Sequence, residues 1–167
     1  MVGFSKESIK AIRKWIRESG FSVGCRLTEK EFFYDSFQNA IFLPKNYADE
    51  ETDPFFKAFL LENGLKNADL NVVTLSILHE LGHAETDHLF TEEEWALDTL
   101  LKINNDENAL EKYANAKEYL YAYWNTLTEK GANNWAIMYA NTFETKTEKL
   151  NEIVEKALTF DLKCGIV

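Results

Sequence analysis

The chain has 167 residues, 46% of them hydrophobic and 14% aromatic, so we expect one domain, residues 1–167, with a substantial core. A formal net charge of −10 argues against nucleic-acid partners, whose phosphates require clustered Lys and Arg side chains. The sequence contains no apolar run of about 18 residues, which argues against a membrane-spanning helix.

The N-terminal segment and the cysteines indicate a cytoplasmic protein. Residues 1–20 carry charges throughout and lack the apolar stretch and small-residue cleavage site of a signal peptide. The two cysteines, Cys25 and Cys164, are far apart, and neither belongs to a C-x-x-C pair. We therefore expect free thiols in a reducing cytosol.

The first predicted element is a helix over residues 5–19. Ser5 is a suitable N-cap and Gly20 a suitable stop. Apolar side chains between them recur at the spacing of one helix face, so this helix should pack against the core.

Two short segments rich in aromatic and β-branched residues then predict a β-hairpin. Its strands are residues 31–35 and 40–43, joined by a turn at 36–39, and Pro44 ends the second strand. A further strand is indicated around residues 21–27. We therefore expect a small antiparallel sheet near the N-terminus.

The remaining sequence predicts helices, which makes the expected fold class α+β and mostly helical. The predicted helices cover residues 53–64, 70–86, 91–103 and 107–159, with an interruption near 125–131. Asp53 and Asp69 are candidate N-caps, and Thr91 with Glu94 has the spacing of a capping box. The polar run 104–106 predicts a break.

Residues 79–83 read His-Glu-Leu-Gly-His and end an apolar run that suits a buried helix. Two histidines four residues apart lie on one helix face, so both imidazoles can meet one zinc ion at about 2.0–2.1 Å. Glu80 lies beside the pair and can take a proton from a metal-bound water. The pattern therefore predicts His79 and His83 as zinc ligands and Glu80 as the catalytic base. The alternative is a helix with two core histidines, which would bury polar groups at a cost of several kcal/mol unless they had partners.

A catalytic zinc site needs a third protein ligand, and several residues are candidates. His88 is one position short of the metzincin pattern H-E-x-x-H-x-x-G-x-x-H. Glu85 and Asp87 are too near the motif to close the site unless the helix ends abruptly. The cluster Glu92–Glu94 sits at a helix start, where acidic side chains interact favourably with the helix dipole.

Glu129 is the best candidate for the third ligand. It precedes Ala132 by three residues and so projects from the predicted buried face that also carries Ala136. The two alanines would let this helix approach the motif helix closely. Asn133, one turn on, could accept a hydrogen bond from the second nitrogen of a ligating histidine. The alternative is a capping box of Thr126 and Glu129, which needs no metal.

The motif and the string Glu-x-x-Ala-Asn-x-Trp-Ala that begins at Glu129 resemble the ImmA/IrrE-type metallopeptidases, small zincin-fold proteins of bacteria, mobile elements and phages. Residues 40–44 are similar to the segment that this family places before its motif helix. The resemblance covers about residues 30–140 and implies a zincin-like fold with Glu129 as third ligand. It also implies that Asn133 supports a ligating histidine. The chain departs from the family at Gly131, where an acidic residue is common, and at 138–141, where the family often has an apolar Leu-Leu-Met-Pro segment. We also expect no helix-turn-helix DNA-binding region, so the family's role in cleaving a repressor does not carry over.

The expected function is therefore that of a zinc-dependent metallopeptidase with Zn²⁺ as cofactor and a protein or peptide as substrate. An exposed edge strand, best predicted at residues 40–43, could bind an extended peptide by strand addition. Tyr123 and Tyr139 are candidate oxyanion stabilisers. The alternative is a non-proteolytic zincin-fold binding or regulatory protein with a retained or structural zinc site. The pattern specifies neither a cleavage site nor an oligomeric state.

Overall fold

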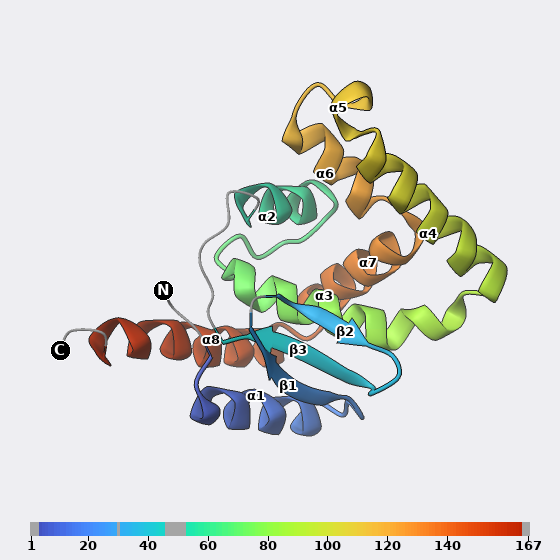
Figure 1. Ribbon diagram of the computed structural model, residues 1–167. Helices are drawn as coiled ribbons and strands as arrows, with labels where there is room; N and C mark the ends of the chain where they lie inside the picture. Colours follow the sequence, from blue (N-terminus) through green and yellow to red (C-terminus); the bar gives the residue numbers. More distant parts are fainter. Residues whose placement is uncertain (1–3, 30, 46–52, 165–167) are drawn as a thin grey trace.

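The computed structural model describes residues 4–29, 31–45 and 53–164, and Figure 1 shows a small sheet and an N-terminal helix beside a larger helical part. The elements are α1 (Lys6–Glu18), β1 (Gly24–Thr28), β2 (Phe33–Asp35), β3 (Ala40–Pro44), α2 (Asp53–Glu62), α3 (Val72–Thr86), the short 3₁₀ helix η1 (Asp87–Leu89), α4 (Glu92–Glu107), α5 (Ala109–Lys112), α6 (Ala116–Trp124), α7 (Leu127–Thr142) and α8 (Glu144–Cys164). This arrangement confirms the α+β class. No helix in the described part of the chain is both long and apolar enough to cross a membrane.

The sheet is mixed rather than antiparallel. Its strand order is β1-β3-β2, with β2 antiparallel to β3, as predicted for the hairpin, and β1 parallel to β3. The third strand inserts between the other two because its apolar side chains Ile41 and Leu43 are fully buried. The prediction that residues 40–43 form an exposed edge strand is therefore wrong, and the edges are β1 and β2.

The first helix agrees with its sequence pattern. The Ser5 hydroxyl accepts a hydrogen bond from the backbone N–H of Ser8 at 3.1 Å, and Gly20 has a φ of +97° just after the helix ends. Trp15 of this helix is buried, and its indole N–H donates a hydrogen bond to the carbonyl of Lys146 in α8 at 2.8 Å. The helix is thus fixed to both the sheet and the C-terminal helix.

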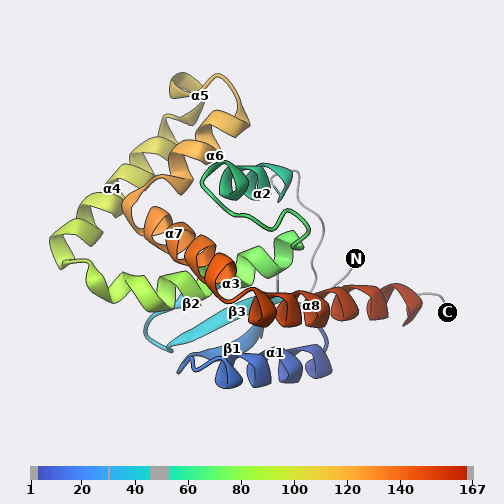
Figure 2. The same ribbon diagram turned by 180° about the vertical axis from the view of Figure 1, so that it is seen from behind.

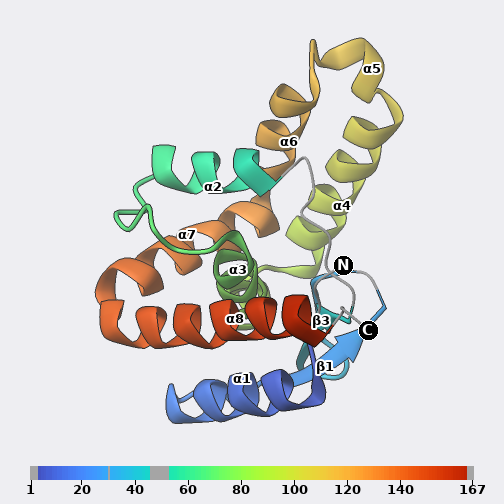
Figure 3. The ribbon, with the colours of Figure 1, turned by 90° about the vertical axis from the view of Figure 1, so that its left-hand side faces the viewer.

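The motif helix α3 lies at the centre of the molecule. Figure 3 looks along it and shows α2, α7, α8 and the sheet arranged around it. It begins after Asn71, whose side chain accepts from the backbone N–H of Val73 at 2.9 Å, so the predicted cap at Asp69 is wrong. Seen from behind, α7 runs beside α3 (Figure 2).

Two predicted interruptions need correction. The capping box of Thr91 and Glu94 starts α4 as predicted, but α4 continues to Glu107 through the polar run 104–106. The helix persists there because Asn105 is buried against the rest of the protein. The interruption near 125–131 is shorter than predicted, since α7 begins at Leu127.

Cys25 is a buried free thiol. The side chain of Cys164 lies outside the described residues.

Candidate metal centre

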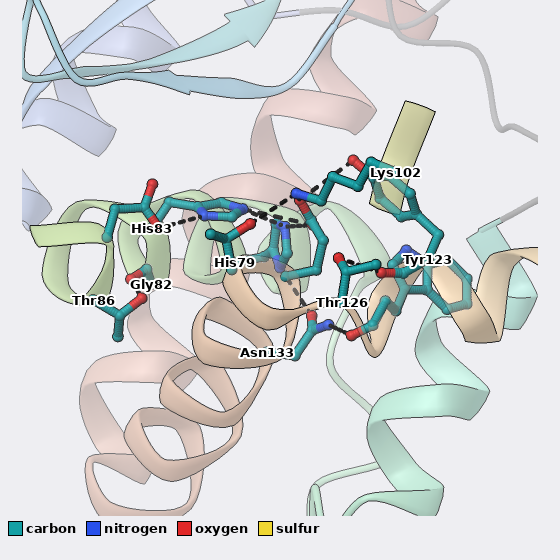
Figure 4. Close-up of polar contacts among 12 residues, drawn as sticks. His79, Gly82, His83, Thr86, Lys102, Tyr123, Thr126 and Asn133 are labelled. Carbon is teal, nitrogen blue, oxygen red and sulfur yellow. Dashed lines mark hydrogen bonds and ion pairs between the residues drawn. The ribbon is translucent and has the colours of Figure 1, made fainter. Parts of the chain in front are cut away.

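Three side chains from α3 and α7 bring their donor atoms together (Figure 4). The Nε2 atoms of His79 and His83 are 3.2 Å apart. The Oε2 atom of Glu129 lies 3.2 Å from Nε2 of His79 and 3.6 Å from Nε2 of His83. Ligands at 2.0–2.1 Å from a tetrahedral zinc are separated by about 3.3 Å, so the three residues could hold a metal ion without rearrangement.

The close approach of α3 and α7 places Glu129 over the histidines. A Cβ atom on Gly82 would lie 2.5 Å from the carbonyl oxygen of Ala132 and 2.8 Å from its Cα atom. Ala132 and Ala136 are both buried, as the sequence predicted. Gly82 lies inside the motif itself, and its part in this contact was not foreseen from the sequence.

Each histidine is oriented through its second ring nitrogen. Nδ1 of His79 is 2.9 Å from Oδ1 of Asn133, whose amide nitrogen donates to the carbonyl of Trp124 at 3.1 Å. This second bond fixes the amide, so Nδ1 of His79 donates to it and Nε2 is the ring nitrogen directed at Glu129 and the candidate metal position. The predicted contact of Asn133 is present.

The partner of His83 was missed from the sequence. Its Nδ1 atom lies 3.0 Å from Oδ1 of Asp87 in η1, four residues on. An ionised carboxylate can only accept, so Nδ1 of His83 donates and its Nε2 also points toward Glu129. The available signal was the spacing of four residues, which places His83 and Asp87 on one helix face.

The second carboxylate oxygen of Glu129 has its own partners. Oε1 accepts from Nζ of Lys102 in α4 at 2.7 Å and from the hydroxyl of Tyr123 in α6 at 3.3 Å. The capping-box alternative is wrong, because the Thr126 hydroxyl instead donates to the carbonyl of Tyr123 at 2.8 Å. Nothing in the sequence pattern pointed to Lys102.

Burial and charge shift the pKa values of the site in the metal-free protein. Burial raises the pKa of Glu80, even though the two neighbouring histidines oppose the shift. Burial alone would lower the pKa of His83, but hydrogen bonds to Asp87 and Glu129 raise it to about 10. Burial opposes ionisation of Glu129 as well, yet hydrogen bonds with His79 and His83 hold its pKa far below its usual range. The centre therefore pairs a carboxylate with an imidazolium.

The three donor atoms face a cleft of about 550 Å³. Part of its wall is aromatic, with side chains from four elements: Phe33 and Tyr34 of β2, Phe56 of α2, Trp95 of α4, and Tyr123 and Trp124 of α6. Glu80 also lines the cleft, and the backbone of Tyr34 hydrogen-bonds to its carboxylate. The edge strand beside the site is thus β2 and not residues 40–43.

The other candidate residues lie elsewhere. His88 and the cluster Glu92–Glu94 are exposed, and Glu94 is engaged in the capping box. Neither they nor Glu85 belong to the group of potential ligands found among the described residues. Tyr139 packs its ring against Trp15 in the aromatic core, so of the two tyrosines considered it is Tyr123 that lines the cleft.

Comparison of the chain with protein-family models, with curated proteins and with solved structures gave no match. The site is therefore interpreted from its own chemistry. Two imidazole nitrogens and one carboxylate oxygen, next to an open cleft and a further buried carboxylate, form a donor set that suits a divalent transition metal.

Proposed function

We propose that this protein is a zinc-dependent metallopeptidase that hydrolyses peptide bonds of a protein substrate, with His79, His83 and Glu129 as ligands and Glu80 as general base. The observation that carries the proposal is the meeting of three ligand atoms at tetrahedral spacing beside the Glu80 carboxylate, at the wall of a cleft. The resemblance of the two motifs to the ImmA/IrrE-type peptidases supports the same assignment.

The donor set supports zinc as the metal. Two histidines and one carboxylate are the ligands of several catalytic zinc sites, which leave a fourth position for water. When bound, Zn²⁺ polarises a peptide carbonyl and lowers the pKa of a water molecule to about 7.

Glu80 has the position and the environment of a general base. Glu80 directly follows His79, lines the same cleft as both histidines, and is only 7% exposed. Burial raises its pKa, which brings the group closer to the working pH at which proton transfer is most efficient. In this proposal Glu80 takes a proton from water and passes it to the leaving amine.

The cleft supports a peptide as substrate. The edge strand β2 borders it, and an extended chain can add to such an edge through backbone hydrogen bonds. The aromatic walls offer apolar contact to side chains of that chain. The hydroxyl of Tyr123 lies within the cleft and donates to Oε1 of Glu129 at 3.3 Å; only by leaving that bond could it donate to a carbonyl oxygen under attack.

The test separates metal binding from catalysis. We expect one zinc per chain in the wild type and in Glu80→Gln, and hydrolysis of unfolded casein or a quenched peptide library to fall by about 10²- to 10⁴-fold in Glu80→Gln. Glu85→Gln, on the same helix but outside the ligand group, should retain both properties.

Glu80→Gln with wild-type activity would contradict the proposed base. A wild type that holds zinc without hydrolysing any of these substrates would favour the non-proteolytic alternative.

A further inference from the structure

Helix α4 packs against the protein with its polar side. Its buried residues are Asp98 and Asn105, and Lys102 on the same face is largely covered. By contrast, Leu97, Leu100 and Leu101 are 68%, 63% and 49% exposed. A surface helix ordinarily buries its apolar side, so the inward polar groups of α4 call for a specific explanation.

The two charged groups on this face converge on the start of α7. Asp98 accepts from the backbone N–H of Leu127 at 2.5 Å and from the hydroxyl of Thr128 at 2.7 Å. It thereby caps α7 from another helix, in place of the Thr126 side chain. The first turn of α7 carries Glu129, so α4 fixes the backbone on which the third ligand stands.

Lys102 completes the contact at the ligand itself. Its ammonium group donates to Oε1 of Glu129 at 2.7 Å and to the hydroxyl of Thr128 at 2.7 Å, and lies 3.3 Å from Oδ2 of Asp98. Two of the three ammonium protons are thus donated to Glu129 and Thr128, and the carboxylate of Asp98 pairs with the charge. Lys102 is therefore held toward Glu129 rather than free to bind a substrate.

The contacts make the two oxygens of Glu129 unequal. Oε2 faces both histidines, whereas Oε1 is engaged by Lys102 and Tyr123. A carboxylate can bind a metal through one oxygen or two, and the second oxygen would occupy a position that a catalytic site keeps for water or substrate.

We propose that Lys102, anchored by Asp98, is a positioning residue that holds Oε1 of Glu129 away from the metal, so that Glu129 binds through Oε2 alone. This inference rests on the metal site of the proposed function. The pair of Asp98 and Lys102 is neutral overall, so it orients the ligand without adding net charge beside the metal.

Cobalt substitution tests this role without relying on peptidase activity. Four-coordinate Co²⁺ has intense visible d–d absorption, which weakens severalfold when a fifth ligand atom binds. We expect intense bands in the wild type, loss of most of this intensity in Lys102→Met at equal Co²⁺ content, and partial recovery in Lys102→Arg, which restores a donor to Oε1. Lys112→Met is the matched control, because Nζ of Lys112 contacts Asn105 at 3.4 Å and no ligand.

If Lys102→Met alone does not fold, the double variant Asp98→Asn/Lys102→Met is measured in its place, because it removes both charges together. A wild-type spectrum in either folded variant would overturn the inference while leaving the metal site intact. A wild type that binds no Co²⁺ would overturn the metal site and this inference together.

Discussion

The contact between α3 and α7 and the contact between α4 and α7 are built in opposite ways. The first is close packing of small and apolar residues, with Gly82 against the backbone of Ala132. The second is a set of hydrogen bonds and ion pairs from Asp98 and Lys102, while leucines of α4 face solvent. Apolar packing fixes where the backbones lie, and the polar contact fixes how one carboxylate is turned.

The candidate metal centre stands where the two contacts meet. Glu129 is held on one side by the α3–α7 packing and on the other by Lys102. Perturbing each contact should therefore give a different result. Changes at α3–α7 should alter stability and metal binding together, changes to Asp98 and Lys102 should alter stability and the binding mode of Glu129, and changes on the exposed side of α4 should alter none of these.

The largest expected effect is the pH dependence of the metal-free protein, since the pKa of His83 is about 10 when folded and near 6.5 when unfolded. A raised folded pKa contributes stability that is fully present below about pH 6.5 and is lost as the pH rises toward 10. The expected loss is on the order of several kcal/mol. Thermal unfolding in EDTA between pH 6 and 10 measures it.

Saturating Zn²⁺ should suppress this loss, because the metal takes the place of the proton on His83. His88→Asn is the control, since His88 is exposed and its loss should leave the pH profile unchanged. A melting temperature in EDTA that stays constant from pH 6.5 to 9.5 would contradict the ion pair of His83 with Glu129.

The next effect is expected at the closest point between α3 and α7. Gly82→Ala forces a Cβ atom against the backbone of Ala132 and should lower the free energy of unfolding by about 3 kcal/mol. The helices must then separate, so zinc affinity should fall as well. Urea denaturation and zinc titration measure the two effects.

Gly131→Ala is the matched control for this substitution. Its Cβ atom would meet the side chains of Phe90 at 3.0 Å and Thr86 at 3.3 Å, which can rotate away, and alanine is a better helix former by up to about 1 kcal/mol. If Gly82→Ala were as stable as Gly131→Ala, close packing would not be what positions α7.

The sequence indicated which ligand residues of α3 and α7 meet, although not the part of Gly82 in that contact, and it did not indicate the orientation of α4, for a physical reason. Histidine spacing, two alanines and a carboxylate on an apolar face are local patterns, and the structure brings His79, His83, Glu129 and Asn133 together as those patterns indicated. In α4 the leucines would ordinarily mark the buried face. The orientation of that helix depends instead on partners some 30 positions away at the start of α7, and apolar periodicity contains no information on them.

The sheet illustrates the same limit. The hairpin of β2 and β3 was predicted because its strands are adjacent in sequence. The parallel pairing of β1 with β3 depends on a crossover that places β2 on the far edge, and a strand's own residues do not specify it. The error matters for function, because it is β2 that borders the cleft.

A smaller effect is expected from the residues that orient the histidines. Asn133→Ala and Asp87→Ala each remove an acceptor from Nδ1 of a ligand, which should weaken zinc binding by about 10- to 100-fold. Competition with a chromophoric chelator measures this change. Asn134→Ala, an exposed neighbour on α7, should bind zinc as the wild type does. Unchanged affinity in both variants would mean that the rings are held by packing alone.

The smallest effect is expected on the exposed side of α4, and it is the sharpest test of the comparison. Leu97→Ala removes apolar atoms that are already in water, so the free energy of unfolding should change by less than about 0.5 kcal/mol. Asp98→Ala, at the adjacent position, leaves donors of Leu127 and Thr128 without their acceptor and should lower the free energy of unfolding by about 1–3 kcal/mol.

On an ordinary amphipathic helix the order of these two effects would be reversed, because the leucine would be buried and the aspartate exposed. Urea denaturation of the two variants side by side therefore decides which face of α4 holds it to the protein: a larger loss in Leu97→Ala would mean that the leucines are covered in solution and that the polar contact with α7 is secondary.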